Sequence, residues 1–431
     1  MIPIIIYNIP RQDIWPIDVC GLIRVCDIDC CASGLPEQVR LSGESDNTVM
    51  YVAWVQAANW STSSFVQFGS GPSALPFSVR PFVHTYHSGN WKGFIYNATL
   101  TGLAQGQKYY YRVGSNDGGW SKTFSFKTFI NSGYESTTTT WAVIGDMGTN
   151  FESDNTIAHL KSLVAQEKLV GILHNGDIAY ADGVQRRWDD YGRKVEDITA
   201  NVQYQTVPGN HEMAIVTYLG LEGYKNRWFM PYNWPLARPG GQEAYWYTFT
   251  RGPLRVIGIN SESHLDLALI SQDQLDWLKG ALELAKQTRK SHPWLLVMLH
   301  RPLYCTSSSH MECGTLAVWL RDWLETMFQE YGVDIVVTAH MHNYERTIPL
   351  YQGVGHPGYK NALAPVYVVN GAAGCREGLS GFDQNVPSWS AVRVHDNGYA
   401  LMDVTMNTLT WKFYTSKDNV LRDTMVLTKS N

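Results

Sequence analysis

The chain lacks any block of lysine and arginine of the kind that neutralises a phosphate backbone. Its 34 basic residues are outnumbered by 39 acidic residues, and the formal net charge is -5 at pH 7. We therefore expect no nucleic-acid partner. Long apolar runs are also missing, since none approaches the ~18 to 20 residues that a membrane-spanning helix needs. We accordingly expect no membrane-embedded segment.

A recognisable signal peptide is absent as well. The first residues, MIPIIIYNIPRQDIW, are apolar but contain Pro3 and Pro10 and have no basic segment before the apolar run. Residues 1–33 differ in character from the rest of the chain and are left unassigned. Four cysteines in this segment fit no zinc pattern of paired C-x2-C hooks, and they are also unassigned, as is Cys375. These four are Cys20, Cys26, Cys30 and Cys31.

Features typical of secreted proteins are nevertheless present. Two sequons, NWS at Asn59 and NAT at Asn97, would be glycosylated only in a secretory compartment, although each tripeptide alone is often a chance occurrence. Cys305 and Cys313 bracket a short loop. Together these features favour a secreted or lysosomal protein, and for such a protein we predict a disulfide between the two cysteines.

Two domains are expected, because 431 residues exceed the ~250 to 300 that a single core usually supports. Residues 34–129 read as short strands broken by turns, with alternating apolar positions in KYYYRVG and TFSF and no helical segment. This pattern predicts a fibronectin- or immunoglobulin-like β-sandwich. Residues 130–140, INSGYESTTTT, form a polar linker.

Residues 141–431 have a different pattern, in which apolar strands alternate with helices. The stretch SDNTIAHLKSLVAQEKL carries Ile157, Leu160, Leu163 and Val164 at helical spacing, between the strands WAVIGD and GILHNGD. Further helices are expected near SQDQLDWLKGALELAKQ and LAVWLRDWLETMFQEYG. Continuous apolar strands that alternate with helices predict an α/β domain whose sheet is covered on both faces.

Polar residues that can bind metals come directly after five of the expected strands. In an open α/β sheet the carboxyl ends of strands form one ligand-binding rim, so these residues should converge. If HMH is extended, its two histidines lie on the same face. The residues are Asp146 in WAVIGDMG, Asp177 and Tyr180 in GILHNGDIAY, Asn210 and His211 in TVPGNHE, His300 in LLVMLH, and His340 and His342 in DIVVTAHMH.

Each of these residues has an ordinary explanation when it is considered alone. Asp146 and Asp177 could cap a turn or helix, Asn210 could be a turn residue, and His300 could be a buried core histidine. Their joint occurrence favours a metal site instead. Seven candidate ligands are too many for one six-coordinate ion, so we predict two ions, which suit phosphoryl transfer to water. Nitrogen and oxygen ligands without cysteine suit iron, zinc or manganese.

The blocks GDMG, GDIAY, GNHE, VMLH and AHMH, in this order and spacing, closely resemble the signature of the purple acid phosphatases, a family of calcineurin-like metallophosphoesterases. The resemblance runs from about Leu35 to the C-terminus and includes HNYER after the last block. HRPLYC followed by Cys313 is typical of the long animal branch. The resemblance implies a catalytic domain with a β-sandwich core, two stacked sheets, flanked by helices.

The resemblance also implies a role for each candidate residue. Asp146, Tyr180 and His342 would bind Fe(III), and Asp177 would bridge to a divalent zinc, iron or manganese ion. The divalent ion would be completed by Asn210, His300 and His340. His211 would bind substrate phosphate. In plant members a pair of histidines after the VMLH block helps to bind phosphate and to protonate the leaving group. This chain has Ser309 and His310 there, so one histidine of the pair is missing. His310 would keep the catalytic role, or it is an exposed loop residue.

The resulting hypothesis is an acid phosphatase for small phosphate monoesters, active at acidic pH. Two alternatives remain open at this point. One is a phosphodiesterase or nucleotide pyrophosphatase on the same metals, and the other is a catalytically silent binding protein whose β-sandwich mediates the interaction. The sequence specifies neither the oligomeric state nor the natural substrate.

Overall fold

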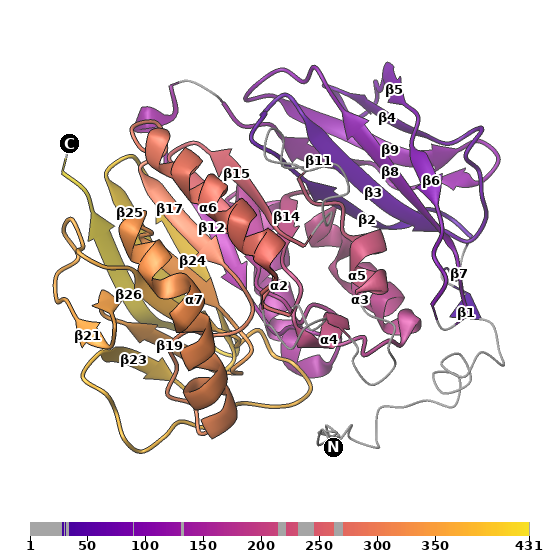
Figure 1. Cartoon of the computed structure of the whole chain (residues 1–431). Helices are drawn as coiled ribbons and strands as arrows, with labels where there is room; N and C mark the ends of the chain where they lie inside the picture. Colours follow the sequence, from indigo (N-terminus) through magenta and orange to yellow (C-terminus); the bar gives the residue numbers. More distant parts are fainter. Residues whose placement is uncertain are drawn as a thin grey trace.

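The structure is a computed structural model that describes residues 28–29, 31, 34–88, 90–130, 133–213, 221–231, 245–262 and 270–430. Figure 1 shows a β-sandwich at the N-terminal side and a larger α/β part that carries the C-terminus. Cys20, Cys26 and Cys30 lie outside the described residues, as does the side chain of His310. Among the described residues, no helix is both long enough and apolar enough to cross a membrane.

The expected β-sandwich is present. One sheet has the order β2-β3-β8-β6, and the other has the order β10-β9-β4-β5 with β11 paired to β9. The alternating residues Tyr109, Tyr111 and Val113 are all buried in the core between the sheets, as expected from the period of two. The strands are β2 (Glu37–Ser42), β3 (Met50–Gln56), β4 (Phe65–Gly69), β5 (Phe77–Val79), β6 (Phe82–His84), β8 (Phe94–Leu100), β9 (Lys108–Ser115), β10 (Gly119–Trp120) and β11 (Phe124–Lys127), with β1 (Ile28–Asp29) paired to β7 (Trp91–Lys92) beside them.

The α/β part is built on two stacked sheets. One contains β26-β25-β24-β12-β13-β14, and the other has the order β15-β16-β17-β18-β22-β19-β23. The strands of the first are β12 (Thr139–Ile144), β13 (Gly171–His174), β14 (Gln203–Thr206), β24 (Gly398–Val404), β25 (Thr408–Thr415) and β26 (Leu421–Thr428). Those of the second are β15 (Tyr247–Arg251), β16 (Leu254–Gly258), β17 (Trp294–Met298), β18 (Ile335–Thr338), β19 (Tyr344–Thr347), β22 (Val366–Asn370) and β23 (Ser390–Val394), and β20 (Leu350–Tyr351) pairs with β21 (Val354–Gly355) outside both sheets.

The two sheets meet through large aromatic side chains. Trp141 of β12 packs against Phe249 of β15 with ring centroids 5.9 Å apart. Tyr344 of β19 stacks on Phe413 of β25 at 4.0 Å, and its hydroxyl accepts a hydrogen bond from Nε1 of Trp411. These contacts pack the two sheets against each other.

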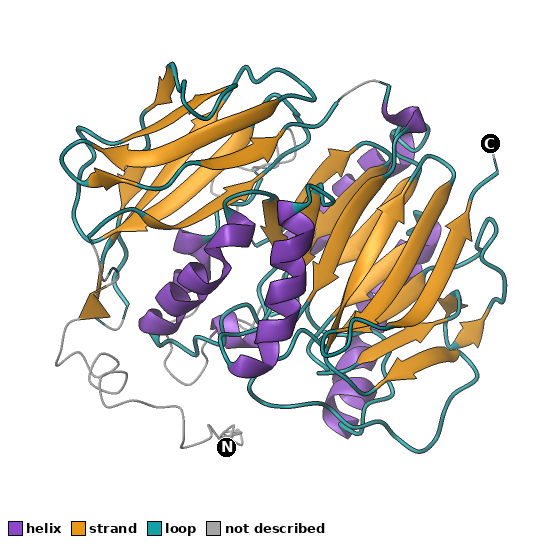
Figure 2. Ribbon diagram, turned by 180° about the vertical axis from the view of Figure 1, so that it is seen from behind, coloured by secondary structure: helices purple, strands orange, loops and turns teal. Residues whose placement is uncertain are grey.

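Helices cover the outer faces of the two sheets. Figures 1 and 2 show α6 and α7 on one side, and α2 and α3 on the other. The three helices expected from the sequence are present, and Ser271 caps the start of α6 by accepting a hydrogen bond from the backbone of Gln274. The helices are α2 (Asp154–Ala165), α3 (Gln185–Thr199), α4 (Asn210–Met213), α5 (Glu222–Arg227), α6 (Gln272–Gln287) and α7 (Ala317–Glu330), with short helical turns at η1 (Tyr134–Ser136), η2 (Phe151–Ser153) and η4 (His310–Leu316).

The β-sandwich is joined to the α/β part by backbone as well as by side chains. Strand β14 pairs with β2 through Gln203 and Leu41, so that one sheet of ten strands runs through both parts of the molecule (Figure 1). Beside this junction, Asp189 of α3 accepts hydrogen bonds from Gln38 and Trp91 of the β-sandwich. The sandwich is therefore firmly attached to the part of the chain that carries the candidate ligands.

Candidate metal centre

All five strands that were expected to carry metal ligands end at the same edge of the α/β part. Strands β12, β13 and β14 are mutually parallel in one sheet, and β17 and β18 are parallel in the other. The connections after these strands bring seven side chains from residues 146 to 342 together. The geometry agrees with the rule that ligands bind outside the carboxyl ends of parallel strands.

One half of the site is formed by Asp146, Tyr180 and His342. The hydroxyl of Tyr180 lies 3.1 Å from Oδ1 of Asp146 and 3.0 Å from Nε2 of His342. Nε2 of His342 is also 3.5 Å from Oδ1 of Asp146. Burial, together with the nearby Asp146 carboxylate, raises the pKa of Tyr180 well above its usual value. Three possible metal-ligand atoms, one from each residue, thus face one another. The phenol among them is hard to ionise unless a cation is bound.

The other half is formed by Asp177, Asn210, His300 and His340. Ligand atoms of Asp177, His300 and His340 all lie within 4.8 Å of one another. Nε2 of His300 is 3.0 Å from Oδ1 of Asn210 and 3.2 Å from Nδ1 of His340. These nitrogen and oxygen atoms suit a divalent ion such as zinc.

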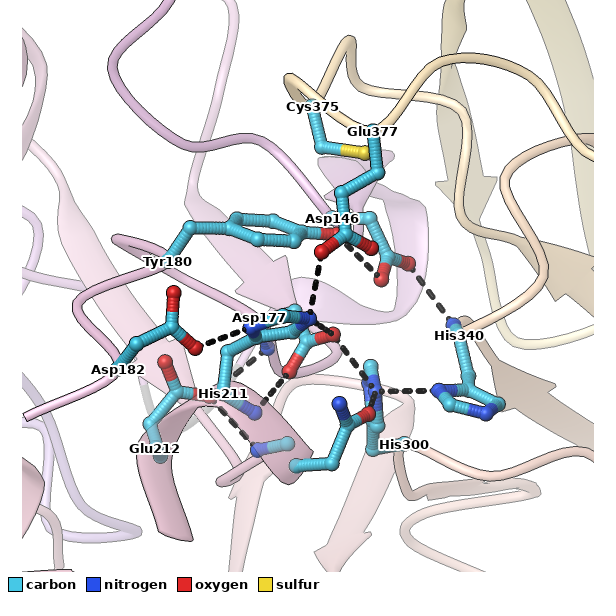
Figure 3. A network of polar contacts seen from close by, with 12 residues as sticks. Asp146, Asp177, Tyr180, Asp182, His211, Glu212, His300, His340, Cys375 and Glu377 are labelled. Atoms are coloured by element: carbon cyan, nitrogen blue, oxygen red, sulfur yellow. Dashed lines mark hydrogen bonds and ion pairs between the residues drawn. The ribbon is translucent and has the colours of Figure 1, made fainter. Parts of the chain in front are cut away.

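Asp177 lies centrally, between His211 and His300 (Figure 3). Its Oδ1 accepts a hydrogen bond from the backbone of His211, and its buried Oδ2 lies 3.2 Å from Nε2 of His300 and 3.8 Å from Nε2 of His211. Burial would raise the pKa of Asp177, but the charges of His300 and His211 hold it well below its usual range. Burial likewise would lower the pKa of His300, but Asp177 raises it to about 9. A buried carboxylate oxygen that faces two histidines, one of them a candidate ligand itself, fits a metal ligand.

The backbone at the site is unusual. Five non-glycine residues have positive φ angles between 50° and 68°, a left-handed conformation that is uncommon outside glycine and asparagine. Residues held this way cluster at functional sites, because tertiary contacts must compensate for the strain. The five are Asp146, Asp177, Tyr180, Asp182 and His340.

The expectation that HMH is extended is wrong. His340 has a φ of 68°, and residues 340–343 form bends between β18 and β19. Backbone hydrogen bonds from Met341 to Ala339 and from Asn343 to Met341 tighten the turn. The two histidines therefore diverge, and His340 faces His300 while His342 faces Tyr180.

His211 lies beside both halves and is held by acidic groups. Its Nδ1 is 2.5 Å from Oδ1 of Asp182, and its Nε2 is 3.4 Å from Oε1 of Glu377. Its ring packs on that of Tyr180 with centroids 4.2 Å apart. Although burial would lower the pKa of His211, Asp177 and Asp182 raise it well above the usual value. The imidazole is therefore held as a cation facing the site.

Several residues that shape the site were not identified from the sequence. Glu212 accepts hydrogen bonds from the backbone of Asp177, Ile178 and Gly209, which ties the turns after β13 and β14 together. The GNHE block shows that Glu212 follows His211 in the sequence. Only the fold shows that its side chain points toward the turns after β13 and β14. The free thiol of Cys375 lies 3.2 Å from Nδ1 of His342, and the carbonyl of Gly378 lies 2.9 Å from the same nitrogen.

The loop between β17 and α7 contains the disulfide that was expected. Cys305 and Cys313 are bonded, which confirms the prediction. Ser309 caps η4 by accepting a hydrogen bond from the backbone of Glu312. His310 begins η4, but its side chain lies outside the described part of the chain, so its expected role stays a prediction.

Comparison with known proteins identifies three matching families along the chain. "Purple acid Phosphatase, N-terminal domain" matches residues 36–128, and "Calcineurin-like phosphoesterase" matches residues 139–344. "Iron/zinc purple acid phosphatase-like protein C" matches residues 364–424. All seven candidate ligands fall within the second of these matches.

Individual relatives cover most of the chain. Acid phosphatase type 7 of Homo sapiens is 34% identical over 400 residues, which are 87% of this chain and 86% of the relative. The Fe(3+)-Zn(2+) purple acid phosphatase 12 of Arabidopsis thaliana is 30% identical over 392 residues, 86% of this chain and 79% of the relative. The structure of purple acid phosphatase PPD1 from yellow lupin (Lupinus luteus) seeds superposes with a TM-score of 0.80 at 23% identity, over 92% of this chain and 75% of that one. This last likeness extends the agreement to the fold.

Proposed function

The chain belongs to the purple acid phosphatase family, and we propose that it hydrolyses small phosphate monoesters at a centre of Fe(III) and a divalent zinc, iron or manganese ion. The observation that carries the proposal is the convergence of seven nitrogen and oxygen donors that include the buried phenol of Tyr180. A generic two-metal hydrolase has no need of a phenolate, whereas a hard trivalent ion favours one.

The two halves of the site divide the proposed ions between them. Asp146, Tyr180 and His342 would hold the ferric ion, and Asn210, His300 and His340 the divalent ion. Asp177, which lies between His211 and His300, would contact both. When bound, such a pair supplies Lewis acidity that polarises the phosphoryl group and lowers the pKa of water.

The chain itself would orient the substrate and stabilise its charge. In the metal-free chain the pKa of His211 is held well above its usual value, chiefly by Asp177, and Nε2 of His211 can donate a hydrogen bond to a phosphate oxygen. Asp182 fixes the ring by accepting from Nδ1, and Arg187 and Arg376 in turn hold Asp182. Glu377 must give up its contact with Nε2 when phosphate binds there. His310 remains a candidate donor to the leaving group.

The proposal includes a secreted or lysosomal location. The Cys305–Cys313 disulfide is typical of oxidising compartments and supports it. Of the two predicted glycosylation sites, Asn59 is exposed, whereas Asn97 is half-buried in β8. Asn59 is thus the better acceptor, because a glycan needs an accessible position.

Comparison of two synthetic esters tests the activity. At acidic pH the protein should hydrolyse p-nitrophenyl phosphate much faster than bis(p-nitrophenyl) phosphate, and a chelator should abolish turnover. Preference for the bis ester would favour the phosphodiesterase alternative. Failure to hydrolyse either ester with metals bound would favour a silent binding protein.

A further inference from the structure

Glu312 connects the disulfide loop to the candidate metal centre. It lies in η4, directly before Cys313, whose bond to Cys305 closes the loop after β17. The side chain is largely buried, with 11% of its surface exposed. In this segment the sequence pointed to Ser309, His310 and Cys313 but not to Glu312.

The carboxylate of Glu312 has two partners. Oε2 lies 2.7 Å from Nη1 of Arg301 and 3.1 Å from Nε2 of His340. Arg301 is itself held at Nε by Glu262, at 2.9 Å. A buried row of alternating charges therefore runs from Glu262 through Arg301 to Glu312 and ends on a candidate metal ligand.

The direction of the hydrogen bond follows from the position of the His340 ring. Nδ1 faces the site, 3.2 Å from Nε2 of His300, so Nδ1 is the nitrogen available to a metal. A histidine that binds metal through Nδ1 must carry its proton on Nε2. Arg301 also lies near this nitrogen, at 3.2 Å, but it cannot donate to a protonated nitrogen. The Nη1–H of Arg301 and the Nε2–H of His340 accordingly both donate to the carboxylate of Glu312.

We propose that Glu312 is a positioning residue that sets the tautomer and orientation of His340 for the divalent ion, and that the Cys305–Cys313 disulfide holds it in place. This inference rests on the proposed function. Partners on the far nitrogen of a ligating histidine fix the ring and increase its basicity, and their loss typically weakens metal binding ~10- to 100-fold. The divalent half of the centre is thereby linked to a disulfide that a reductant can open.

The test compares Glu312→Gln with Glu325→Gln. Glu325 is also a largely buried carboxylate, but it accepts from Tyr304 and from the backbone of Gln352, away from the ligands. Zinc is titrated into each protein after removal of the divalent ion, and iron content and turnover of p-nitrophenyl phosphate are recorded. Glu312→Gln should bind zinc ~10- to 100-fold more weakly, keep its iron, and recover turnover at saturating zinc. Glu325→Gln should bind zinc as the wild type does.

The disulfide is tested in the same assay. Replacing both Cys305 and Cys313 by serine should weaken zinc binding, as Glu312→Gln does. The effect should be smaller in the Glu312→Gln background, because the disulfide acts through that carboxylate.

Two results would overturn the inference. One is unchanged zinc affinity in Glu312→Gln, and the other is a parallel loss of iron, zinc and thermal stability, which would mean a general structural role. A wild-type protein that binds zinc but hydrolyses no ester would refute the proposed function while leaving the zinc comparison valid. A wild type that binds no zinc would overturn both.

Discussion

The hydroxyl oxygen of Tyr180 lies 3.0 Å from Nε2 of His342, although 162 residues separate the two along the chain. The phenol is 2% exposed and also contacts Asp146. Burial and the adjacent carboxylate keep its pKa well above the usual value, so the phenol holds its proton until a strong cation replaces it. This arrangement is what a ferric phenolate site requires.

Replacement of Tyr180 by phenylalanine tests that assignment. A phenolate bound to Fe(III) should produce a charge-transfer band in the visible spectrum, and phenylalanine cannot bind the ion. Tyr180→Phe should therefore abolish the band even where Asp146, Asp177 and His342 retain some iron, and activity should fall less than the colour. Visible spectra and iron assays of the same preparations provide the measurement. A band that persists in the variant would exclude Tyr180 as a ligand.

Asp177→Asn should affect both ions at once. The amide keeps the shape of the side chain but removes the negative charge that faces His211 and His300. Retention of both metals should fall, and turnover should drop by several orders of magnitude. Metal content and kcat of the purified variant check this prediction. Full metal content with near-normal turnover would contradict a bridging role.

The pH dependence of zinc uptake follows from the pKa of His300. In the metal-free chain this pKa is raised to about 9, so below pH 9 the imidazole must lose a proton before it can bind zinc. Apparent affinity for the first zinc equivalent should fall by about tenfold per pH unit between pH 9 and 6.5, with release of one proton. Calorimetric titrations in buffers of different ionisation enthalpy measure both quantities. A flat profile over this range would show that zinc does not displace a proton from His300.

Attachment of the β-sandwich should depend on Asp189. Its Oδ1 lies 2.8 Å from Nη1 of Arg227, and the two side chains are 1% and 4% exposed. Asp189→Ala leaves the buried guanidinium of Arg227 without its carboxylate partner and should lower the free energy of unfolding by about 3 to 5 kcal/mol. The neighbouring Asp190 is 38% exposed and pairs with Arg186 and Arg193, so Asp190→Ala should cost only about 0 to 1 kcal/mol. Equal effects of the two substitutions in denaturant unfolding would contradict this account.

The candidate ligands were predictable because strand ends are visible in a sequence. An apolar run that ends in a polar residue marks the exit of a buried strand, and parallel strands place their exits at one edge. That logic located Asp146, Asp177 and His300 without any contact information. It failed for the backbone conformation between His340 and His342, because a tight turn with a positive φ angle has no periodic pattern in the sequence.

The surroundings of the ligands were less predictable. Glu312 lies in the short helical turn η4 and Glu377 in a loop, and the direction of both side chains depends on the fold rather than on a periodic pattern. The pairing of β14 with β2, through Gln203 and Leu41, joins strands that are distant in sequence. Helix α3 could have been found, since the buried residues Trp188, Tyr191, Val195 and Ile198 recur at helical spacing, but its many charged residues obscure the pattern.

Metal analysis of the purified, active protein tests the central claim most directly. Iron and the divalent metals are quantified on a preparation that hydrolyses p-nitrophenyl phosphate, before and after the divalent ion is removed and restored. The account predicts one iron and one divalent ion per chain, with turnover lost and regained along with the divalent ion. Full activity in a protein that contains no iron, or only one metal ion per chain, would contradict it.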